Sequence, residues 1–279
     1  MTSTEIDAAD EQLALFIKKH PKLFVLTGAG CSTAAGLGDY RDKAGQWKRR
    51  QPITGQQFIG NESARKRYWA RSSVGWPTFS QARPTKAHHA LKALQQAGKL
   101  QQLVTQNVDR LHQKAGHVDV VDLHGVLATV SCIKCANTIC RDKFQEQLID
   151  TNSWLSSLTA AHAPDGDADL EIGELDTMHV PGCGHCNGLL KPDVVFFGEN
   201  VPRETVNHAM DELGKADALL VAGSSLMVYS GFRFCRDAHK RGQSIVILND
   251  GVTRADDIAT LKVDGDIGFR LEKLCTRLQ

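Results

Sequence analysis

Four cysteines stand in two Cys-x-x-Cys pairs, Cys132 with Cys135 and Cys183 with Cys186, and 47 residues separate the pairs. Each pair can direct two thiolates at one tetrahedral metal, and two pairs complete the closed four-sulfur shell of a structural zinc. Disulfides across each pair are the alternative, but two copies in one chain favour zinc. A closed shell leaves no open position for catalysis, so the chemistry must lie elsewhere. The other thiols lack ligand spacing and are expected to be packing residues: Cys31, Cys140, Cys235 and Cys275.

A glycine-rich turn, Gly28-Ala29-Gly30-Cys31-Ser32-Thr33, follows the first predicted strand. A strand, a Gly-x-Gly turn and a helix start bring backbone N–H groups close to a pyrophosphate. Thr33 stands where the usual dinucleotide fingerprint has a third glycine, so a simple tight turn is the alternative. Two later strands end in Gly223-Ser224-Ser225 and Asn249-Asp250-Gly251. Small or hydrogen-bonding residues at three strand ends suit one extended nucleotide lying across the sheet edge.

Polar side chains also follow the second predicted strand, where Gln106, Asn107 and Asp109 could bind sugar hydroxyls or a carboxamide. A helix cap before Leu111 is the alternative for one of them. His124, next to a glycine and just before the cysteine segment, is predicted to close the third strand. That position makes it the best candidate for catalysis among the eleven histidines. Three others are expected to be surface or capping groups, namely His88, His89 and His112.

Apolar strands alternate with helices along the chain, which predicts an α/β fold, a Rossmann-like parallel sheet with helices on both faces. Ligands of such sheets bind outside the carboxyl ends of the strands. Strands are expected at 23–27, 100–105, 118–123, 193–197, 218–222 and 244–248, and helices at 11–20, 86–97, 203–215, 232–241 and 267–278. The expected domains are a Rossmann-like domain of residues 1–36, 86–125 and 191–279, a cofactor-loop and helical insertion of 37–85, and a small zinc-binding domain of 126–190. The polar stretch 160–174 is expected to be a mobile excursion.

Composition argues against several classes of protein. The chain has 33 basic and 32 acidic residues, a balance that implies no nucleic-acid partner. Its longest apolar runs are too short to cross a bilayer, and its first ten residues show neither the apolar core of a secretory signal nor an arginine-rich transit peptide. Together with free thiols, these features predict a cytoplasmic protein, and nothing in the sequence demands more than a monomer.

Taken together, the motifs resemble the sirtuin signature. The resemblance rests on Gly28-Ala-Gly30, Gly36-Leu-Gly-Asp39-Tyr40-Arg41, Thr105-Gln-Asn-Val-Asp109, Leu123-His124-Gly125, the paired cysteines, Lys191-Pro-Asp-Val-Val-Phe-Phe-Gly-Glu199 and Gly223-Ser-Ser-Leu226. These motifs run in order over about residues 10–275. Further segments resemble the class II branch, which includes bacterial relatives of a mitochondrial lipoamidase and ADP-ribosyltransferase-type sirtuin: Arg67–Arg71, Val74–Pro77, Gly223–Gly231 and Thr253-Arg254.

The resemblance implies an NAD-dependent protein-lysine deacylase that consumes NAD, transfers the acyl group to ADP-ribose, and releases nicotinamide and free lysine. By the same resemblance His124 is the general base, while Asn107 and Asp109 are the other residues of the catalytic site. The implied cofactor-binding residues are Gly28, Ala29, Gly30, Ser32, Thr33, Gly36, Asp39, Tyr40, Arg41, Trp47, Gln106, Asn107, Val108, Asp109, Gly223, Ser224, Ser225, Asn249, Asp250, Gly251 and Ile267. The implied substrate-binding residues, which would meet an acylated-lysine protein or peptide, are Val194, Phe196, Phe197, Gly198, Glu199, Val228 and Tyr229.

Other reactions remain open at this stage. A protein mono-ADP-ribosyltransferase, or a deacylase of longer or lipoyl chains, would use the same site. A reversible dehydrogenase is disfavoured, because the second strand ends in Thr105-Gln106-Asn107 instead of an acidic residue. The chain departs from the family pattern at Gly38, in place of proline, and at Tyr40, where the family has phenylalanine. Gly38 should make the cofactor loop more flexible, and both changes leave the acyl preference open.

Overall fold

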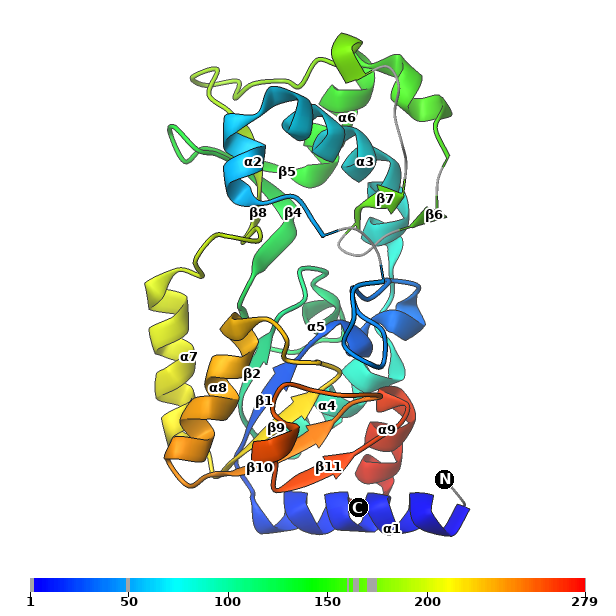
Figure 1. Ribbon diagram of the computed structural model, residues 1–279, viewed down its shortest axis with the longest axis vertical. Helices are drawn as coiled ribbons and strands as arrows, with labels where there is room; N and C mark the ends of the chain where they lie inside the picture. Colours follow the sequence, from blue (N-terminus) through cyan, green and yellow to red (C-terminus); the bar gives the residue numbers. More distant parts are fainter. Residues whose placement is uncertain (1–2, 49–50, 160, 163–165, 170–174, 279) are drawn as a thin grey trace. The chain divides into compact units, whose positions relative to one another are not determined.

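The computed structural model describes residues 3–48, 51–159, 161–162, 166–169 and 175–278 (Figure 1). Contacts divide the chain into two compact units. We call Met1–Arg49, Arg83–Leu123 and Val201–Gln279 the sheet unit, and Arg50–Ala82 with His124–Asn200 the cysteine unit. Compactness does not show which segments fold independently, so the three-part domain organisation expected from the sequence stays a prediction.

The sheet unit contains six strands in the order β11-β10-β9-β1-β2-β3, and all neighbouring strands are parallel. The order reverses beside β1, which pairs with β2 on one side and β9 on the other. Thr27 at the end of β1 lies opposite both Thr105 and Ala222, so the three central strands end at one level. The strands are β1 (Leu23–Thr27), β2 (Leu100–Thr105), β3 (Val120–Asp122), β9 (Ala218–Ala222), β10 (Ser244–Leu248) and β11 (Leu261–Val263).

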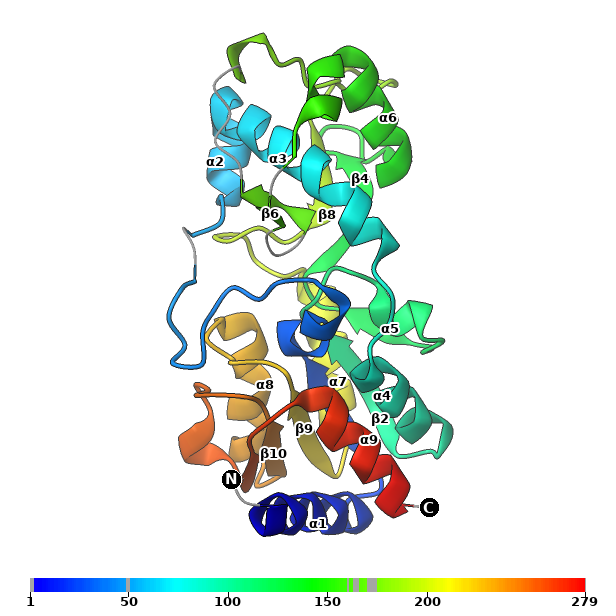
Figure 2. The same ribbon diagram turned by 90° about the vertical axis from the view of Figure 1, so that its right-hand side faces the viewer.

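Helices cover both faces of this sheet (Figures 1 and 2). Leu23 and Val25 of β1 join the core formed with α1 (Ser3–Lys19), α4 (Lys86–Gln96) and α9 (Ile267–Leu278). The intervening Phe24 faces the other way and packs on Phe234 of α8 (Tyr229–Lys240), with ring centroids 5.4 Å apart. Helices α7 (Arg203–Lys215) and α5 (Leu111–Lys114) complete the set of α-helices in the sheet unit. Every residue of β1 and β9 is buried, which explains why their sequences are almost entirely apolar. The parallel sheet with helices on both faces confirms the predicted α/β fold.

The cysteine unit is built on a three-stranded antiparallel sheet of order β5-β4-β8, from Thr138–Cys140, Gly125–Cys132 and Leu190–Val194. Helices α2 (Gly55–Gly60), α3 (Glu62–Gln81) and α6 (Arg141–Thr151) supply Phe58, Trp69 and Phe144 to its core. The strand expected at 193–197 is therefore wrong by three residues, since β8 begins at Leu190. Part of the excursion expected at 160–174 lies outside the described residues, and the described part forms the antiparallel pair β6 (Ala161–His162) and β7 (Ala168–Asp169).

Short 3₁₀ helices connect several elements, at Ala29–Cys31, Thr33–Ala35, Ser153–Ser157, Leu175–Thr177 and Asp256–Ile258. Over the part of the chain that the structure describes, no helix combines the length and the apolar character needed to cross a membrane.

Candidate cofactor site and metal centre

The glycines that follow β1 and β9 meet where the strand order reverses. The N–H of Gly30 donates to the carbonyl oxygen of Gly223 at 2.8 Å. A Cβ atom on Gly28 would lie 2.8 Å from that same oxygen, and one on Gly223 would lie 2.6 Å from the backbone nitrogen of Cys31. Gly223 also has φ +66°, a left-handed conformation that favours glycine. The two turns can therefore touch only because neither carries a side chain here.

The glycine turn does not lead into an α-helix, as the sequence pattern suggested. It forms two 3₁₀ helices, Ala29–Cys31 and Thr33–Ala35, and the second ends at Gly36 with φ +82°. Each is a single turn, so no long helix dipole points at this edge. A ligand here must therefore be held mainly by the turn itself and by side chains, so the expectation of a helix start after the glycines is wrong.

A buried hydrogen-bond network joins the turn to the end of β2. The Ser32 hydroxyl donates to Oδ2 of Asp109 at 2.6 Å, and Nδ2 of Asn107 donates to Oγ of Ser32 at 3.1 Å and to the carbonyl of Gly28 at 3.0 Å. The backbone N–H of Leu111 donates to the other carboxylate oxygen of Asp109 at 2.8 Å. Burial raises the pKa of Asp109, although the hydrogen bonds from Ser32 and Leu111 oppose that rise. The network fixes the orientation of the amide and carboxyl groups.

A second link joins β2 to the turn after β9. Nε2 of Gln106 donates to Oγ of Ser224 at 2.8 Å and to the carbonyl of Thr27 at 3.2 Å. The Ser224 hydroxyl in turn accepts the N–H of Leu226 at 3.2 Å. Thus the polar residues predicted after β1, β2 and β9 do gather at one edge, while Val108 between them is buried.

Three histidines of the sheet unit are buried, and two of them, His88 and His112, were expected to be surface or capping groups. The expectation holds for His88, which caps a helix, and is wrong for His112. His112, expected to be a surface or capping group, is 1% exposed, and its Nε2 lies 2.9 Å from Oγ1 of Thr27. His88 is fully buried and forms a capping box with Thr85, whose hydroxyl donates to the carbonyl of Cys31 at 2.8 Å. Together with His117, whose ring stacks edge-on against His112, they support the glycine turn from below. Thr27 and His112 are 85 residues apart in the sequence, so no local signal could reveal their contact, whereas the contact between Thr85 and His88 is local.

The predicted cofactor loop packs against the turns of the sheet unit. The Arg41 guanidinium lies 4.0 Å from the ring centre of Trp47 and donates to the Gly45 carbonyl at 2.7 Å. A Cβ atom on Gly45 would lie 2.6 Å from the terminal carbon of Met227. Tyr40 meets Trp47 edge-on, with ring centroids 6.0 Å apart. The loop residues Arg41 and Trp47 are thus positioned by mutual stacking.

The same loop meets the end of β10. Lys43 forms an ion pair with Asp250 at 2.8 Å, and its carbonyl accepts the N–H of Val252 at 2.9 Å. Asn249 is buried and donates from Nδ2 to the carbonyl of Gly251 at 3.2 Å. The predicted cofactor-binding residues that follow β10 therefore lie beside the cofactor loop. Ile267, at the start of α9, is buried in the apolar core.

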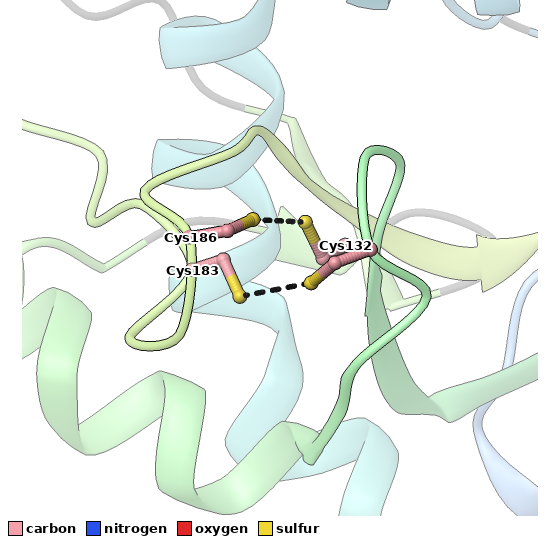
Figure 3. A group of neighbouring side chains, drawn as sticks. Cys132, Cys183 and Cys186 are labelled. Carbon is pink, nitrogen blue, oxygen red and sulfur yellow. Dashed lines mark hydrogen bonds between the residues drawn. The ribbon is translucent and has the colours of Figure 1, made fainter.

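The four cysteines of the two pairs converge in the cysteine unit, and their Sγ atoms all lie within 4.8 Å of one another. Figure 3 shows Cys132 facing Cys183 and Cys186 of the other pair. The Sγ atoms of Cys132 and Cys186 are 3.5 Å apart, and those of Cys135 and Cys183 are 3.7 Å apart. Four sulfurs bound to zinc at ~2.3 Å in a tetrahedron would be separated by about 3.8 Å. The spacing therefore fits one structural zinc. None of the eight cysteines forms a disulfide.

The four cysteines outside the two pairs were expected to be packing residues, and the structure agrees for some of them only. Cys31 and Cys235 are buried, as packing residues should be, and burial raises the pKa of each thiol to about 12. Cys140 is exposed at the start of α6. The expectation that all four remaining cysteines are packing residues is thus wrong for Cys140.

His124 stands where the chain enters the cysteine unit, immediately before β4. Strand β3 is Val120–Asp122, so the strand predicted at 118–123 begins two residues too early and ends one residue too late. The N–H of Leu123 donates to the carbonyl of Thr105 at 2.9 Å. The half-buried His124 accepts the N–H of Val195 at its carbonyl, at 2.8 Å. Gly125 has φ +78°, and a Cβ atom there would lie 2.1 Å from the Asp193 carbonyl. The backbone of His124 is therefore tightly fixed.

Two segments contain the predicted substrate-binding residues. In the cysteine unit, the Phe197 carbonyl accepts the N–H of Gly55 at 3.0 Å, and Glu199 accepts the N–H of Phe196 at 2.9 Å. Phe196 stacks on Phe58 with centroids 5.1 Å apart, so its ring belongs to the core. Val194 is half-buried in β8, while Gly198 is exposed. In the sheet unit, the exposed Val228 and Tyr229 precede and begin α8.

Comparison with known proteins agrees with this architecture. The model of the Sir2 family matches residues 28–230. A Bradyrhizobium diazoefficiens protein named NAD-dependent protein deacetylase 2 is 55% identical over 256 residues, covering 92% of this chain and 94% of its own. A Xanthomonas campestris protein named NAD-dependent protein deacetylase is 57% identical over 249 residues, covering 89% and 85%. A solved Sir2 homologue in complex with NAD superposes with a TM-score of 0.73 at 31% identity, covering 96% and 93% of the two chains.

The Rossmann-like sheet and the four-cysteine centre define a nucleotide-binding protein with a zinc module. The extent of the match and of the identity shows more than that: the chain belongs to the Sir2 family. The family, the enzyme class and NAD as cofactor, all expected from the sequence, are thereby confirmed, and the cysteine cluster fits the expected zinc. The class II assignment fits these findings.

Proposed function

We propose that this protein removes acetyl or other acyl groups from protein lysines while consuming NAD. The observation that carries the proposal is the buried network of Ser32, Asn107 and Asp109, set against the glycine turn at the switch point of the sheet. The relatives named NAD-dependent protein deacetylase support it, as does a solved Sir2 complex with a p53 peptide and NAD, which is 29% identical with a TM-score of 0.72, over 96% of each chain.

The residues of the sheet unit bind and orient the cofactor in this proposal. The glycine turn receives the pyrophosphate, and Gln106 and Asn107 hold the ribose next to nicotinamide. Asp109 orients the carboxamide, because its carboxylate is already fixed by Ser32 and the Leu111 N–H. When bound, NAD supplies a leaving group, nicotinamide, and the ribose that receives the acyl group.

His124 acts as the general base and accepts a proton from a ribose hydroxyl. A base whose pKa lies near neutrality contributes roughly 10²- to 10⁴-fold to such a step. The departure of nicotinamide needs no base in this scheme. The proposal therefore separates two activities of one site, of which only the acyl transfer depends on His124.

The test is His124→Ala, with His89→Ala as a matched control, since His89 is an exposed histidine of α4. Deacetylation of an acetyl-lysine peptide should fall by roughly 10²-fold or more, while zinc content and melting temperature stay unchanged and some nicotinamide exchange survives. Mass spectrometry of peptide and O-acyl-ADP-ribose scores the acyl transfer. Normal deacetylation by well-folded His124→Ala would refute the assignment of the base.

The same assay tests the remaining possibilities. A panel of acetyl, longer-chain and lipoyl peptides identifies the acyl group, and labelled NAD distinguishes acyl transfer from ADP-ribosylation of protein side chains. We further propose that the protein acts as a monomer on acylated proteins of the cytoplasm. Sedimentation at micromolar concentration tests the monomeric state and should give the mass of one 30.5 kDa chain. Cell fractionation tests the cytoplasmic location.

A further inference from the structure

Helix α8 presents aromatic and basic side chains on one face of its first two turns. Three side chains follow Tyr229 at spacings of three, four and seven residues, namely Phe232, Arg233 and Arg236. These spacings place all four on one stripe of the helix. The guanidinium carbons of Arg233 and Arg236 lie 5.4 Å and 5.1 Å from the ring centre of Tyr229. Both cations are thus within the range of a cation–π interaction with this one ring.

A third arginine reaches the same ring from the loop after β10. The guanidinium carbon of Arg254 lies 4.5 Å from the ring centre of Phe232 and 5.9 Å from that of Tyr229. The backbone of Arg254 is fixed, because its N–H donates to the Ser225 carbonyl at 2.9 Å. Three cations therefore surround a tyrosine that is 41% exposed.

The charge of this cluster is not neutralised by the part of the chain that the structure describes. Of the acidic residues close to it in sequence, Asp237 pairs with Arg241 at 2.6 Å and Asp256 pairs with Lys262 at 2.7 Å. Among the described residues, Asp257 forms no ion pair with an arginine of the cluster. Nε of Arg233 is buried without a hydrogen-bond partner among the described residues. Three like charges held together in this way repel one another, and an external anion would relieve that repulsion.

We propose that this tyrosine–arginine cluster, formed by Tyr229, Arg233, Arg236 and Arg254, binds acidic residues that flank the acyl-lysine in protein substrates. The inference rests on the proposed function and on the expectation that Val228 and Tyr229 meet the substrate peptide. Exposed tyrosine and arginine side chains are the types enriched at protein-binding surfaces. The charge of the cluster selects an acidic peptide segment over a neutral or basic one.

The experiment compares three acetyl-lysine peptides at saturating NAD: a neutral one, one with two aspartates before the lysine, and one with two aspartates after it. The double variant Arg236→Gln/Arg254→Gln changes two exposed side chains, and Arg241→Gln, at the residue that caps the C-terminus of α8, is a charge control. We expect the unmodified protein to favour one acidic peptide roughly fivefold in kcat/KM, with the difference in KM. The double variant should lose that preference and keep its activity on the neutral peptide, whereas Arg241→Gln should keep both.

Each outcome separates this inference from the proposed function. Activity on the neutral peptide without any acidic preference would overturn the acidic-substrate inference alone. A preference that survives in the double variant, or that Arg241→Gln abolishes equally, would also overturn it. Failure to deacylate the neutral peptide with any acyl group of the panel (acetyl, longer-chain or lipoyl) would overturn the proposed function itself. Raising the salt concentration should reduce the preference in the unmodified protein, since exposed ion pairs are screened.

Discussion

The contact between the two glycine turns makes Gly223→Ala the most informative single change in the sheet unit. A methyl group there would lie 2.6 Å from the backbone nitrogen of Cys31 and 2.8 Å from the carbonyl carbon of Gly30, both backbone atoms that cannot rotate away. The residue would also keep φ near +66°, where side chains are disfavoured. Both effects act at the predicted pyrophosphate site.

A second glycine with a similar φ separates the cost of the left-handed backbone from the cost of the steric overlap. Gly98, in the turn before β2, has φ +69°, and a Cβ atom there would meet nothing within 4 Å. Gly98→Ala should therefore lower the free energy of unfolding only through the left-handed backbone, by about 1–2 kcal/mol. Gly223→Ala adds the overlap, which in packed interiors costs about 1–3 kcal/mol more. The entropy that alanine removes from the unfolded chain is the same at both positions and cancels in the comparison.

Chemical denaturation measures the stability of both variants, and calorimetry with ADP-ribose measures binding. Gly223→Ala must push the turn after β9 away from β1, which strains the 2.8 Å hydrogen bond between Gln106 and Ser224. We expect ADP-ribose to bind at least about tenfold more weakly, a loss of ~1.4 kcal/mol, whereas Gly98→Ala should bind it normally. Equal stability of the two variants, together with unchanged binding by Gly223→Ala, would refute the close approach of the turns.

Two further predictions follow from the buried cysteines and histidines. Cys183→Ser should lose the zinc and destabilise the cysteine unit, whereas the variant of the exposed Cys140, Cys140→Ser, should keep one zinc per chain. Metal analysis measures the zinc content, and proteolysis measures the stability of the unit. Full stability of a metal-free protein would contradict the assignment of a structural zinc to the four cysteines. Burial lowers the pKa of His88 to about 3 and also lowers that of its neighbours, so these rings are neutral when folded but titrate near 6.5 when unfolded. The free energy of unfolding should therefore be highest above about pH 6.5 and should fall below that pH by ~1.4 kcal/mol per pH unit for His88 alone. Chemical denaturation at pH 7 and pH 5 measures this dependence, which His88→Gln should reduce and the exposed His89→Gln should leave unchanged.

Most of the sheet could be predicted from the sequence because its central strands are largely buried, with every residue of β1 and β9 buried. The strands at 23–27, 100–105, 218–222 and 244–248 have the predicted bounds, as do the helices at 203–215 and 267–278. Helix α1 begins eight residues before the expected position, in a polar segment without apolar periodicity. Strand β11 has only three residues, too short a run to stand out from a loop.

The parts of the site that escaped prediction depend on contacts between distant residues. Gly30 and Gly223 are neighbours in space but far apart in the chain, so no local motif explains why neither can carry a side chain. His112 was expected to be a surface or capping group, yet this buried residue of α5 contacts Thr27 at the end of β1, 85 residues away in the sequence. The convergence of the four cysteines, by contrast, was predictable, because the chemistry of the thiolate ligand fixes both spacing and number.

The division of roles between Asp109 and His124 follows from how each residue is held. Both carboxylate oxygens of Asp109 accept hydrogen bonds, from Ser32 and from the backbone of Leu111, and the side chain is buried. A carboxylate held in this way is poorly placed to move a proton to and from a ligand, but it fixes the geometry around it. His124 is half-buried, and its backbone position is set by the bond from Val195 and by Gly125. Of the two groups, the histidine is the one whose usual pKa suits proton transfer near neutrality, so we assign acid–base chemistry to His124 and positioning to Asp109.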